Sequence, residues 1–405
     1  MKILMVNKFL YPNGGSETYI FELGKCLTEM GHEVQFFGME HEGRIVGNKA
    51  DIYTDNMDFH GGKLKKLTYP FKIIYSKEAA RKITKVLEDF EPDVVHLNNI
   101  NFQITPSIID AITDYDIKHA KDTKIVATAH DYQWVCPNHM MKKPSQVTPC
   151  FACEGGKYMN CVKGKCIHGS TARSVIGAAE GYFYKARKTY GLVDKVICPS
   201  EFMKTKLETN PELADKCIAM HNFLVGEDAR RDNPETNDTK YVLYFGRFSE
   251  EKGIATLLKV CKALPEVKFV FAGSGPLKEE VDAVSNIEDR GFLSGEELHS
   301  LIRNARFTVF PSEWYENCPF SVMESQQFGT PIIASDLGGT PELVEDGVTG
   351  ELFEAGNDKD LAARIKDLWE NDDKINAYRT GCRNVNFDTV GQYCEKLLEI
   401  YDKID

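Results

Sequence analysis

The sequence predicts an α/β protein of two domains, each built on a doubly wound parallel sheet. Its 405 residues exceed what a single hydrophobic core usually organises. Short apolar runs alternate with stretches of helical periodicity, which is typical of parallel sheets covered by helices. A strand, a loop with glycine or charge, and a helix follow one another at the start of the chain and again from Tyr241. Two domains of the same architecture are therefore expected.

The first domain is expected over residues 1–222. A strand over 2–7 leads through a loop with Gly14 and Gly15 to a helix over 16–30, for which Ser16 is a plausible N-cap. A second strand follows over 33–37. This start is Rossmann-like but lacks G-x-G-x-x-G, which weakens a dehydrogenase interpretation. Further strands are expected over 93–97, 124–129, 195–198 and 218–220, and helices over 76–90, 104–112, 170–190 and from Pro199.

His130 directly follows the strand over 124–129. A side chain at the carboxyl end of such a strand points toward the ligand side of the sheet. An unshifted imidazole titrates near neutrality, so His130 would hydrogen-bond a hydroxyl or relay a proton, with Asp131 orienting it. A structural histidine that caps the loop is the alternative.

The second domain is expected over residues 239–385, after a polar linker over 223–238 without periodicity. Its first strand ends at Gly246 and Arg247, and Lys252 precedes the next helix. A guanidinium and an ammonium together neutralise a diphosphate. The glycines at 273 and 275 follow the next strand and would let the backbone approach a nucleotide closely.

Residues 307–334 form the central unit of this domain. A buried strand over 307–310 and a polar loop lead to a helix opened by Pro319. The helix would leave the N–H groups of Phe320, Ser321 and Val322 unpaired, which suits a phosphate. Glu316 and Glu324 flank that position, and carboxylates suit the hydroxyls of a sugar and a ribose. The alternative is a solvated loop acid and a surface helix residue. Later helices are expected over 358–370, 374–382 and 388–404.

The spacing Glu316-x7-Glu324, with the following GTPIIAS and GG-PELV, resembles the retaining glycosyltransferases of family 4, which have the GT-B fold. The glycine, arginine and lysine motifs have family-like spacing, and the resemblance extends over most of the chain. It implies two Rossmann-like domains that face a cleft and a segment over 386–405 that crosses back to the first domain. It also implies transfer from a UDP- or GDP-sugar to a glycan, lipid-linked or polysaccharide acceptor, in envelope, capsule or exopolysaccharide assembly.

The resemblance assigns roles by position. Retention would proceed through a short-lived oxocarbenium-like ion pair, without a metal at the chemistry. The loop at Phe292 would read the base through its backbone, and Asn222 would lie at the edge of the cleft. The residues expected at the chemistry are His130, Arg247, Lys252 and Glu316. The residues expected to bind the donor are Gly15, Asn222, Gly246, Gly273, Gly275, Phe292, Pro319, Phe320, Ser321, Val322 and Glu324.

Residues 136–170 hold five of the twelve cysteines. Cys150 and Cys153 have the spacing that places two thiolates on one metal. Some relatives of the resembled family share cysteines at Cys136, Cys150, Cys153 and Cys166, which implies a structural four-thiolate site. Zinc is the first expectation and an iron–sulfur cluster the second. Reduced thiols without a metal, or disulfides formed on purification, are the alternative.

Composition and charge limit the classes of partner that the protein is expected to bind. The net charge of −12 and the lack of a basic domain argue against nucleic acid. The first residues look like a strand rather than a signal peptide, so a cytoplasmic protein is expected. Residues 60–75 mix lysines with aromatics, which predicts a peripheral contact with the inner face of the membrane. Two alternative functions remain. One is a GT-B sugar-nucleotide epimerase or hydrolase, and the other is a non-catalytic partner subunit that binds nucleotide sugar or another transferase.

Overall fold

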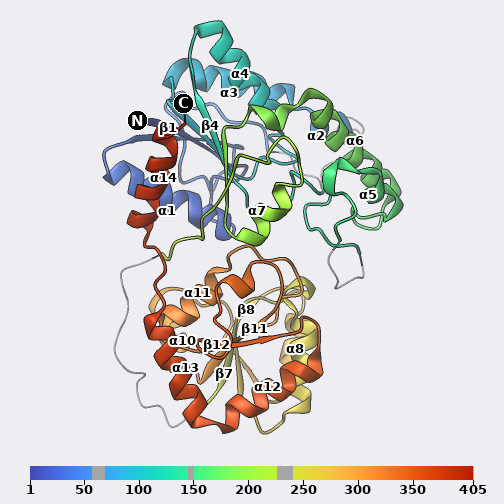
Figure 1. The fold of residues 1–405 in the computed structure, drawn as a ribbon, viewed down its shortest axis with the longest axis vertical. Helices are drawn as coiled ribbons and strands as arrows, with labels where there is room; N and C mark the ends of the chain where they lie inside the picture. The colour runs from blue at the N-terminus through green and yellow to red at the C-terminus, as the bar shows by residue number, and fades with distance from the viewer. Residues whose placement is uncertain (57–68, 145–149, 226–239, 405) are drawn as a thin grey trace. The chain divides into compact units, whose positions relative to one another are not determined.

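The computed structural model describes residues 1–56, 69–144, 150–225 and 240–404. These residues form two compact units, which are visible in Figure 1. Unit 1 comprises Met1–His221 together with Val390–Asp405, and unit 2 comprises Asn222–Thr389. Each unit contains one six-stranded sheet in which every pair of neighbouring strands is parallel. The predicted α/β architecture of two parallel sheets is confirmed.

The sheet of unit 1 has the strand order β2-β1-β3-β4-β5-β6. The order reverses between β1 and β3, which are neighbours in the sheet although β2 separates them in sequence. Its strands are β1 (Lys2–Val6), β2 (Glu33–Phe37), β3 (Val94–Leu97), β4 (Lys124–Thr128), β5 (Lys195–Cys198) and β6 (Cys217–Ala219). Its helices are α1 (Gly15–Glu29), α2 (Tyr69–Ile74), α3 (Lys77–Phe90), α4 (Ser107–His119), α5 (Met159–Lys163), α6 (Thr171–Arg187), α7 (Glu201–Leu207) and α14 (Val390–Asp402).

Two helix starts in unit 1 show how local chemistry sets the boundaries. The Ser76 hydroxyl accepts a hydrogen bond from the Ala79 N–H and so caps α3. Ser16 does not cap α1 as predicted, because the N-cap position belongs to Gly14, which has no side chain to offer. The Ser16 hydroxyl donates instead to Glu17.

A buried polar network fixes α14 to the sheet of unit 1. The Tyr19 hydroxyl lies 2.9 Å from the Tyr393 hydroxyl and 3.0 Å from the Thr128 hydroxyl. The His96 ring bonds the Tyr401 hydroxyl through Nδ1 and the Thr128 hydroxyl through Nε2. All five side chains are buried. Because a buried polar group without a partner is costly, this network specifies where α14 docks.

The sheet of unit 2 has the order β12-β11-β10-β7-β8-β9. Counted within the unit, this is the Rossmann order 3-2-1-4-5-6, and the order reverses between β7 and β10. Its strands are β7 (Val242–Arg247), β8 (Phe269–Ser274), β9 (Ile287–Asp289), β10 (Phe307–Phe310), β11 (Ile332–Ser335) and β12 (Gly350–Phe353). Its helices are α8 (Ile254–Ala263), α9 (Lys278–Asp282), α10 (Gly295–Asn304), α11 (Phe320–Gln327), α12 (Asp358–Glu370) and α13 (Asp372–Asn384).

The two ends of unit 2 lie side by side. The Leu224 N–H donates to the Asp388 carbonyl at 2.9 Å, and Leu224 forms a parallel bridge with Thr389. Asn222 is tied to Cys318 by two hydrogen bonds. Unit 2 is therefore a closed segment whose ends meet in a short strand pair.

Two sequence predictions fall largely outside the described residues. Residues 57–68 hold most of the predicted membrane segment, and 226–239 hold most of the predicted linker. The described end of the membrane segment is α2, where Pro70 occupies the first turn and does not prevent a helix. No helix within the described ranges is long and apolar enough to cross a bilayer.

Candidate functional site

The residues predicted to bind a donor gather at the switch point of unit 2. Strands β7 and β10 are neighbours there, and helices follow them on either side of the reversal. The β7 strand ends at Arg247, and the loop that follows β10 carries Glu316. Open α/β sheets bind ligands outside the carboxyl ends of the strands at such a point. The topology thus brings residues 247 and 316 to the same edge of one sheet.

Lys252 and Glu316 form an ion pair at this edge. The Lys252 Nζ lies 2.6 Å from the Glu316 Oε1, and the Ser312 hydroxyl donates to the same oxygen at 2.8 Å. Glu316 is only 9% exposed. A buried carboxylate with two charge-assisted or polar donors is held firmly in one orientation. Glu316 is therefore not the solvated loop acid of the alternative interpretation.

The loops on either side of this ion pair are fixed to each other through their backbones. The Glu313 N–H donates to the Glu251 carbonyl at 2.9 Å, and the Ser312 hydroxyl donates to the same carbonyl at 3.3 Å. Gly253 has φ of +71°, and a Cβ there would lie 1.8 Å from the Pro311 carbonyl oxygen. Only glycine fits this position.

Gly273 and Gly275 serve backbone packing within unit 2. A Cβ on Gly273 would lie 1.9 Å from the Gly246 carbonyl oxygen, and one on Gly275 would lie 2.4 Å from the Phe248 carbonyl oxygen. Sequence reasoning gave these glycines a different purpose, the approach of a nucleotide. Their immediate requirement is the close contact between the carboxyl ends of β7 and β8 and the residues that directly follow them.

The start of α11 differs in one respect from the prediction. Pro319 is the N-cap, and the Val322 N–H donates to the Pro319 carbonyl at 3.1 Å. The predicted free amide at Val322 is therefore wrong, because the first turn tightens onto its own cap. Within the described part of the chain, the N–H groups of Phe320 and Ser321 have no hydrogen-bond partner.

Glu324 and Arg247 are available to a ligand. The half-buried Glu324 carboxylate has no partner among the described residues, and burial raises its pKa to about 7. The Arg247 side chain is exposed and likewise lacks an ion-pair partner within the described ranges. Phe292, in the turn before α10, is 76% exposed. Lys252 and Glu316, in contrast, form an ion pair with each other.

Asn222 supports the loop before α11. Its side-chain N–H donates to the Cys318 carbonyl at 3.0 Å, and its backbone N–H lies 3.2 Å from the Cys318 sulfur. Its buried Oδ1 has no partner in the described structure. The Gly339 N–H holds the other side of that loop through the Glu316 carbonyl at 2.7 Å.

In unit 1, His130 lies after β4 but is oriented by a residue that the sequence analysis did not select. The His130 Nε2 lies 2.9 Å from the Asn98 Oδ1. Asp131, the predicted orienting group, accepts from the Gln133 N–H at 2.9 Å and from the Asn101 side chain at 3.2 Å instead. Burial lowers the pKa of His130 to about 4. The ring is neutral near pH 7, so the predicted proton relay is disfavoured and hydrogen bonding remains.

Lys8 is a further candidate that the sequence analysis missed. It lies just beyond β1, at the switch point of unit 1, where its backbone N–H donates to the Asn99 carbonyl at 2.8 Å. Burial lowers the pKa of the Lys8 ammonium, and the nearby charges of Asp131 and Glu17 only partly offset that effect. No ion pair of Lys8 exists within the described residues. Gly15 opens α1 in the same unit. The signal for Lys8 was its place after the first strand.

The predicted metal site is not supported. Within residues 1–56, 69–144, 150–225 and 240–404, no group of three or more His, Cys, Asp and Glu side chains is arranged to hold a metal ion. Burial raises the pKa of Cys136 to about 12 and that of Cys153 to about 11. Cys153 and Cys161 pack in an apolar cluster with Tyr158 and Ala178. The expected zinc or iron–sulfur centre at Cys136, Cys150, Cys153 and Cys166 therefore has no support among the described residues.

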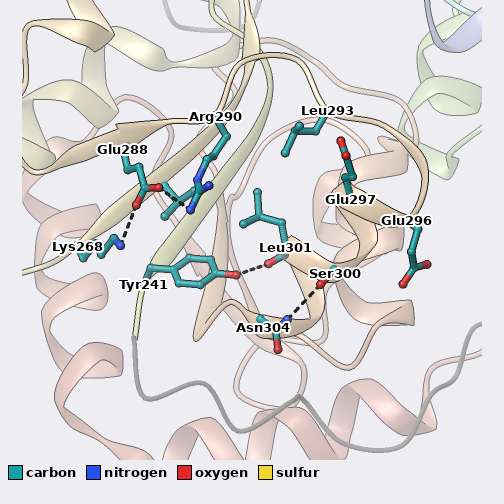
Figure 2. A pocket seen from close by; sticks show the side chains of 11 residues that line it. Tyr241, Lys268, Glu288, Arg290, Leu293, Glu296, Glu297, Ser300, Leu301 and Asn304 are labelled. Carbon is teal, nitrogen blue, oxygen red and sulfur yellow. Dashed lines mark hydrogen bonds and ion pairs between the residues drawn. The ribbon is translucent and has the colours of Figure 1, made fainter.

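Figure 2 shows a separate hollow of about 740 Å³ on unit 2, between the edge strand β9 and α10. Its charged side chains largely satisfy one another, since Glu288 pairs with Lys268 at 2.8 Å and with Arg290 at 2.5 Å. The Tyr241 hydroxyl donates to the Leu301 carbonyl. No residue predicted to bind the donor lines this hollow, which therefore lies apart from the candidate site.

Comparison with known families decides the affiliation. Residues 13–223 match the model of "Glycosyltransferase Family 4", which covers more than half of the chain, and residues 226–384 match "Glycosyl transferases group 1". The chain belongs to glycosyltransferase family 4. The two matched segments together include every predicted site residue of both units.

Individual relatives of this family 4 chain are more distant. An uncharacterised glycosyltransferase of Methanocaldococcus jannaschii is 30% identical over 51% of this chain and 58% of its own length. The lipopolysaccharide 1,2-N-acetylglucosaminetransferase of Salmonella typhimurium is 28% identical over 38% of this chain and 48% of its own. The chain thus spans about half the length of these curated relatives.

Solved structures agree on the fold. Sucrose-phosphate synthase of Thermosynechococcus elongatus superposes with a TM-score of 0.68, at 17% identity, over 99% of this chain and 98% of that one. Anabaena HepE in complex with UDP-glucose gives 0.63, also at 17% identity, over 99% and 100%. The chain has the GT-B fold, as the resemblance implied.

Proposed function

We propose that this family 4 protein is a retaining glycosyltransferase that moves a sugar from a UDP- or GDP-sugar to a glycan, lipid-linked or polysaccharide acceptor. The observation that carries the proposal is the Lys252–Glu316 ion pair at the switch point of unit 2. Two free amides and an unpaired carboxylate belong to the same βαβ unit. The complex of Anabaena HepE with UDP-glucose and the lipopolysaccharide acceptor of the Salmonella relative support the two substrate classes.

Each part of the donor has a matching group in unit 2. Arg247, Lys252 and the amides of Phe320 and Ser321 suit the diphosphate, whose negative charge grows as it departs. Glu316 suits the hydroxyls of the transferred sugar. Glu324 suits the ribose hydroxyls, which donate to a carboxylate. Because the Val322 amide is already paired, it has no part in this scheme.

The ion pair gives each of its two charges a partner within unit 2, since Lys252 and Glu316 lie 2.6 Å apart. A bound donor offers the ammonium a diphosphate and the carboxylate a set of hydroxyls, so both exchange their mutual contact for a ligand. The free energy of donor binding is therefore reduced by the cost of separating the ion pair. The contacts with the diphosphate become stronger as negative charge develops on this leaving group, so they favour the transition state.

The chemical step follows from these contacts. The bond between the anomeric carbon and the diphosphate oxygen breaks, and both electrons leave with the diphosphate. The acceptor hydroxyl attacks the short-lived oxocarbenium-like ion from the same face, and its proton passes to a departing phosphate oxygen. Neutral His130 of unit 1 hydrogen-bonds a sugar or acceptor hydroxyl. Arg247 and Lys252 supply the charge compensation, so the scheme needs no metal. The proposal places the reaction in the cytoplasm at the inner face of the membrane.

The test combines nucleotide binding with product analysis. A thermal-shift screen of nucleotide sugars identifies the donor, and labelled donor is then incubated with envelope glycolipids and polysaccharides. Lys252→Ala should lower transfer by at least a hundredfold while the melting temperature stays unchanged. Lys259→Ala, an exposed lysine on α8, is the matched control and should transfer normally.

Three results would count against the proposal. Release of free or epimerised sugar without transfer to any acceptor would indicate a hydrolase or an epimerase. Absence of nucleotide binding by calorimetry would indicate a non-catalytic partner subunit that binds another transferase. Full activity of the Lys252→Ala variant would remove the ion pair from the mechanism.

A further inference from the structure

A strongly basic segment stands out in this acidic chain. Residues 136–188 contain nine Lys and Arg but only two Asp and Glu, while the whole chain carries a net charge of −12. Neither acid offsets the surface charge, because Glu180 is buried and Glu154 is paired with Lys206 at 3.4 Å. The segment contains the five clustered cysteines and the helices α5 and α6. Figure 1 shows these two helices side by side in unit 1.

The solvent face of α6 carries an apolar stripe. Five exposed apolar residues follow one another at spacings of three and four, which places them on one side of a helix. The other side is buried against unit 1 through residues such as Ala178 and Tyr184. The exposed stripe consists of Ala172, Val175, Ala179, Tyr182 and Ala186.

The stripe extends onto α5 and is bordered by cations. Met159, which is 51% exposed, donates its backbone N–H to the Tyr182 hydroxyl at 3.3 Å. Val175 and Tyr182 are 49% and 40% exposed. At 100° per residue, Lys185 and Arg187 lie on opposite sides of the stripe, and both are exposed. Arg187 is paired with Asp110 at 2.8 Å, so Lys185 supplies the uncompensated charge at the edge of the apolar strip.

We propose that this face, defined as the α6 stripe with Met159 and Lys185 within the basic segment 136–188, docks on an anionic lipid bilayer. A helix that lies in the headgroup region needs an apolar strip of this width with lysine and arginine beside it. A second copy of the chain is a poor occupant, because two such basic faces repel each other in a symmetric contact. The face differs from the segment over 60–75 that the sequence suggested, most of which lies outside the described residues. It does not rest on the donor assignment.

The test is co-sedimentation of the full chain with vesicles, in the absence of any nucleotide sugar. Vesicles of phosphatidylglycerol and phosphatidylcholine should bind the protein, and pure phosphatidylcholine should not. The double variant Val175→Asp with Tyr182→Asp should bind at least tenfold more weakly, and so should the wild type in 0.5 M salt. Ile117→Asp is the control, since Ile117 is a 78% exposed apolar residue on α4 of the same unit, and it should bind like the wild type.

The variants change exposed side chains only, so their melting temperatures should match that of the wild type. Equal binding of the double variant and the wild type would overturn the proposal and assign membrane contact elsewhere. Failure of the wild type to bind anionic vesicles would overturn it outright. A change in the oligomeric state of the double variant, measured by light scattering without lipid, would show that the stripe contacts a second copy instead.

Discussion

Glu316 forms an ion pair with Lys252. In the proposed mechanism, Glu316 would therefore compete with the diphosphate for the Lys252 ammonium. The residue is therefore expected to weaken the binding of a bare nucleotide while it supports transfer of the sugar. Binding and turnover should respond in opposite directions when its charge is removed.

We expect Glu316→Gln to bind UDP or GDP about five- to tenfold more tightly than the wild type, because Lys252 then has no ion pair to break before it contacts the diphosphate. Sugar transfer should fall at least a hundredfold, because an amide holds the sugar hydroxyls less strongly. Titration calorimetry and the transfer assay measure the two effects. Glu345→Gln, an exposed acid of unit 2, should change neither. Unchanged nucleotide affinity in Glu316→Gln would contradict the competition.

Glu324 predicts a pH dependence of stability. Burial raises its folded pKa to about 7 from the usual 4.5, so the folded state binds the proton more tightly than the unfolded state. Its contribution is favourable below about pH 4.5 and is lost as the pH rises through 7, by roughly 3 kcal/mol at most. Glu324→Gln should remove this loss and melt at a higher temperature than the wild type at pH 8. At pH 5 the two should melt alike. Parallel melting curves at every pH would contradict the assignment.

His96 and His130 of unit 1 give the folding stability the opposite dependence on pH. Burial lowers their pKa values to about 3 and about 4, from the usual 6.5. The folded state therefore favours the neutral rings, and this stability is fully present above pH 6.5. It is lost as the pH falls from 6.5 toward 4, because protonation then favours the unfolded chain. Near-ultraviolet circular dichroism should report loss of tertiary structure in this window, and His96→Asn should shift its midpoint.

At the scale of elements, the donor loops depend on backbone contacts that leave no room for a Cβ. The Gly253→Ala substitution places a Cβ on a residue with positive φ, and this Cβ would lie 1.8 Å from the Pro311 carbonyl oxygen. We expect it to destabilise the protein by about 3 kcal/mol or more and to abolish donor binding. Gly347→Ala is the matched control, since Gly347 has φ of +78° with nothing within 4 Å of the added Cβ. It should cost only about 1 kcal/mol in chemical denaturation. Equal costs would show that φ alone constrains Gly253.

Several strands could be predicted closely because most of their residues are buried and form short, largely apolar runs. The strands at 195–198 and 307–310 begin and end where the sequence indicated, and so does the strand at 33–37, although it contains Glu33 and Gln35. Helix starts were less accurate, since α4 begins at Ser107 rather than at residue 104. Caps such as Ser76 follow a local rule, but the choice between Gly14 and Ser16 depends on where the chain leaves β1.

The candidate site was predictable in its residue types but not in its internal contacts. Motif spacing located Lys252 and Glu316, but not their direct ion pair. Asn98 was missed because it follows β3 whereas His130 follows β4, and their contact depends on these two strands being neighbours in the sheet. The metal prediction at Cys136, Cys150, Cys153 and Cys166 is not supported by the described residues. The spacing of cysteines along the chain does not determine how their side chains pack, and Cys153 lies in an apolar cluster. Such contacts depend on tertiary packing, which local patterns do not encode.

At the scale of the whole molecule, the chain enters and leaves unit 2 at one place. Leu224 pairs with Thr389 where the two ends meet, and the segment has its own parallel sheet and apolar core. Unit 1, in contrast, is discontinuous and needs α14 to complete it. An inserted segment with adjacent ends is the kind of unit that folds independently.

We therefore predict that the fragment 222–389 folds alone and binds UDP or GDP, whereas the fragment 1–221 does not fold stably. Without α14, the buried side chains of Tyr393, Leu397 and Tyr401 are lost, and His96 and Tyr19 lose partners inside the core. Each such loss costs about 2–4 kcal/mol, and their sum reaches the 5–15 kcal/mol stability of a typical domain. Circular dichroism and calorimetry on both fragments measure this. A stable fragment 1–221 would mean that α14 contributes little to the core, and a fragment 222–389 that folds without binding nucleotide would show that the donor site needs residues of unit 1.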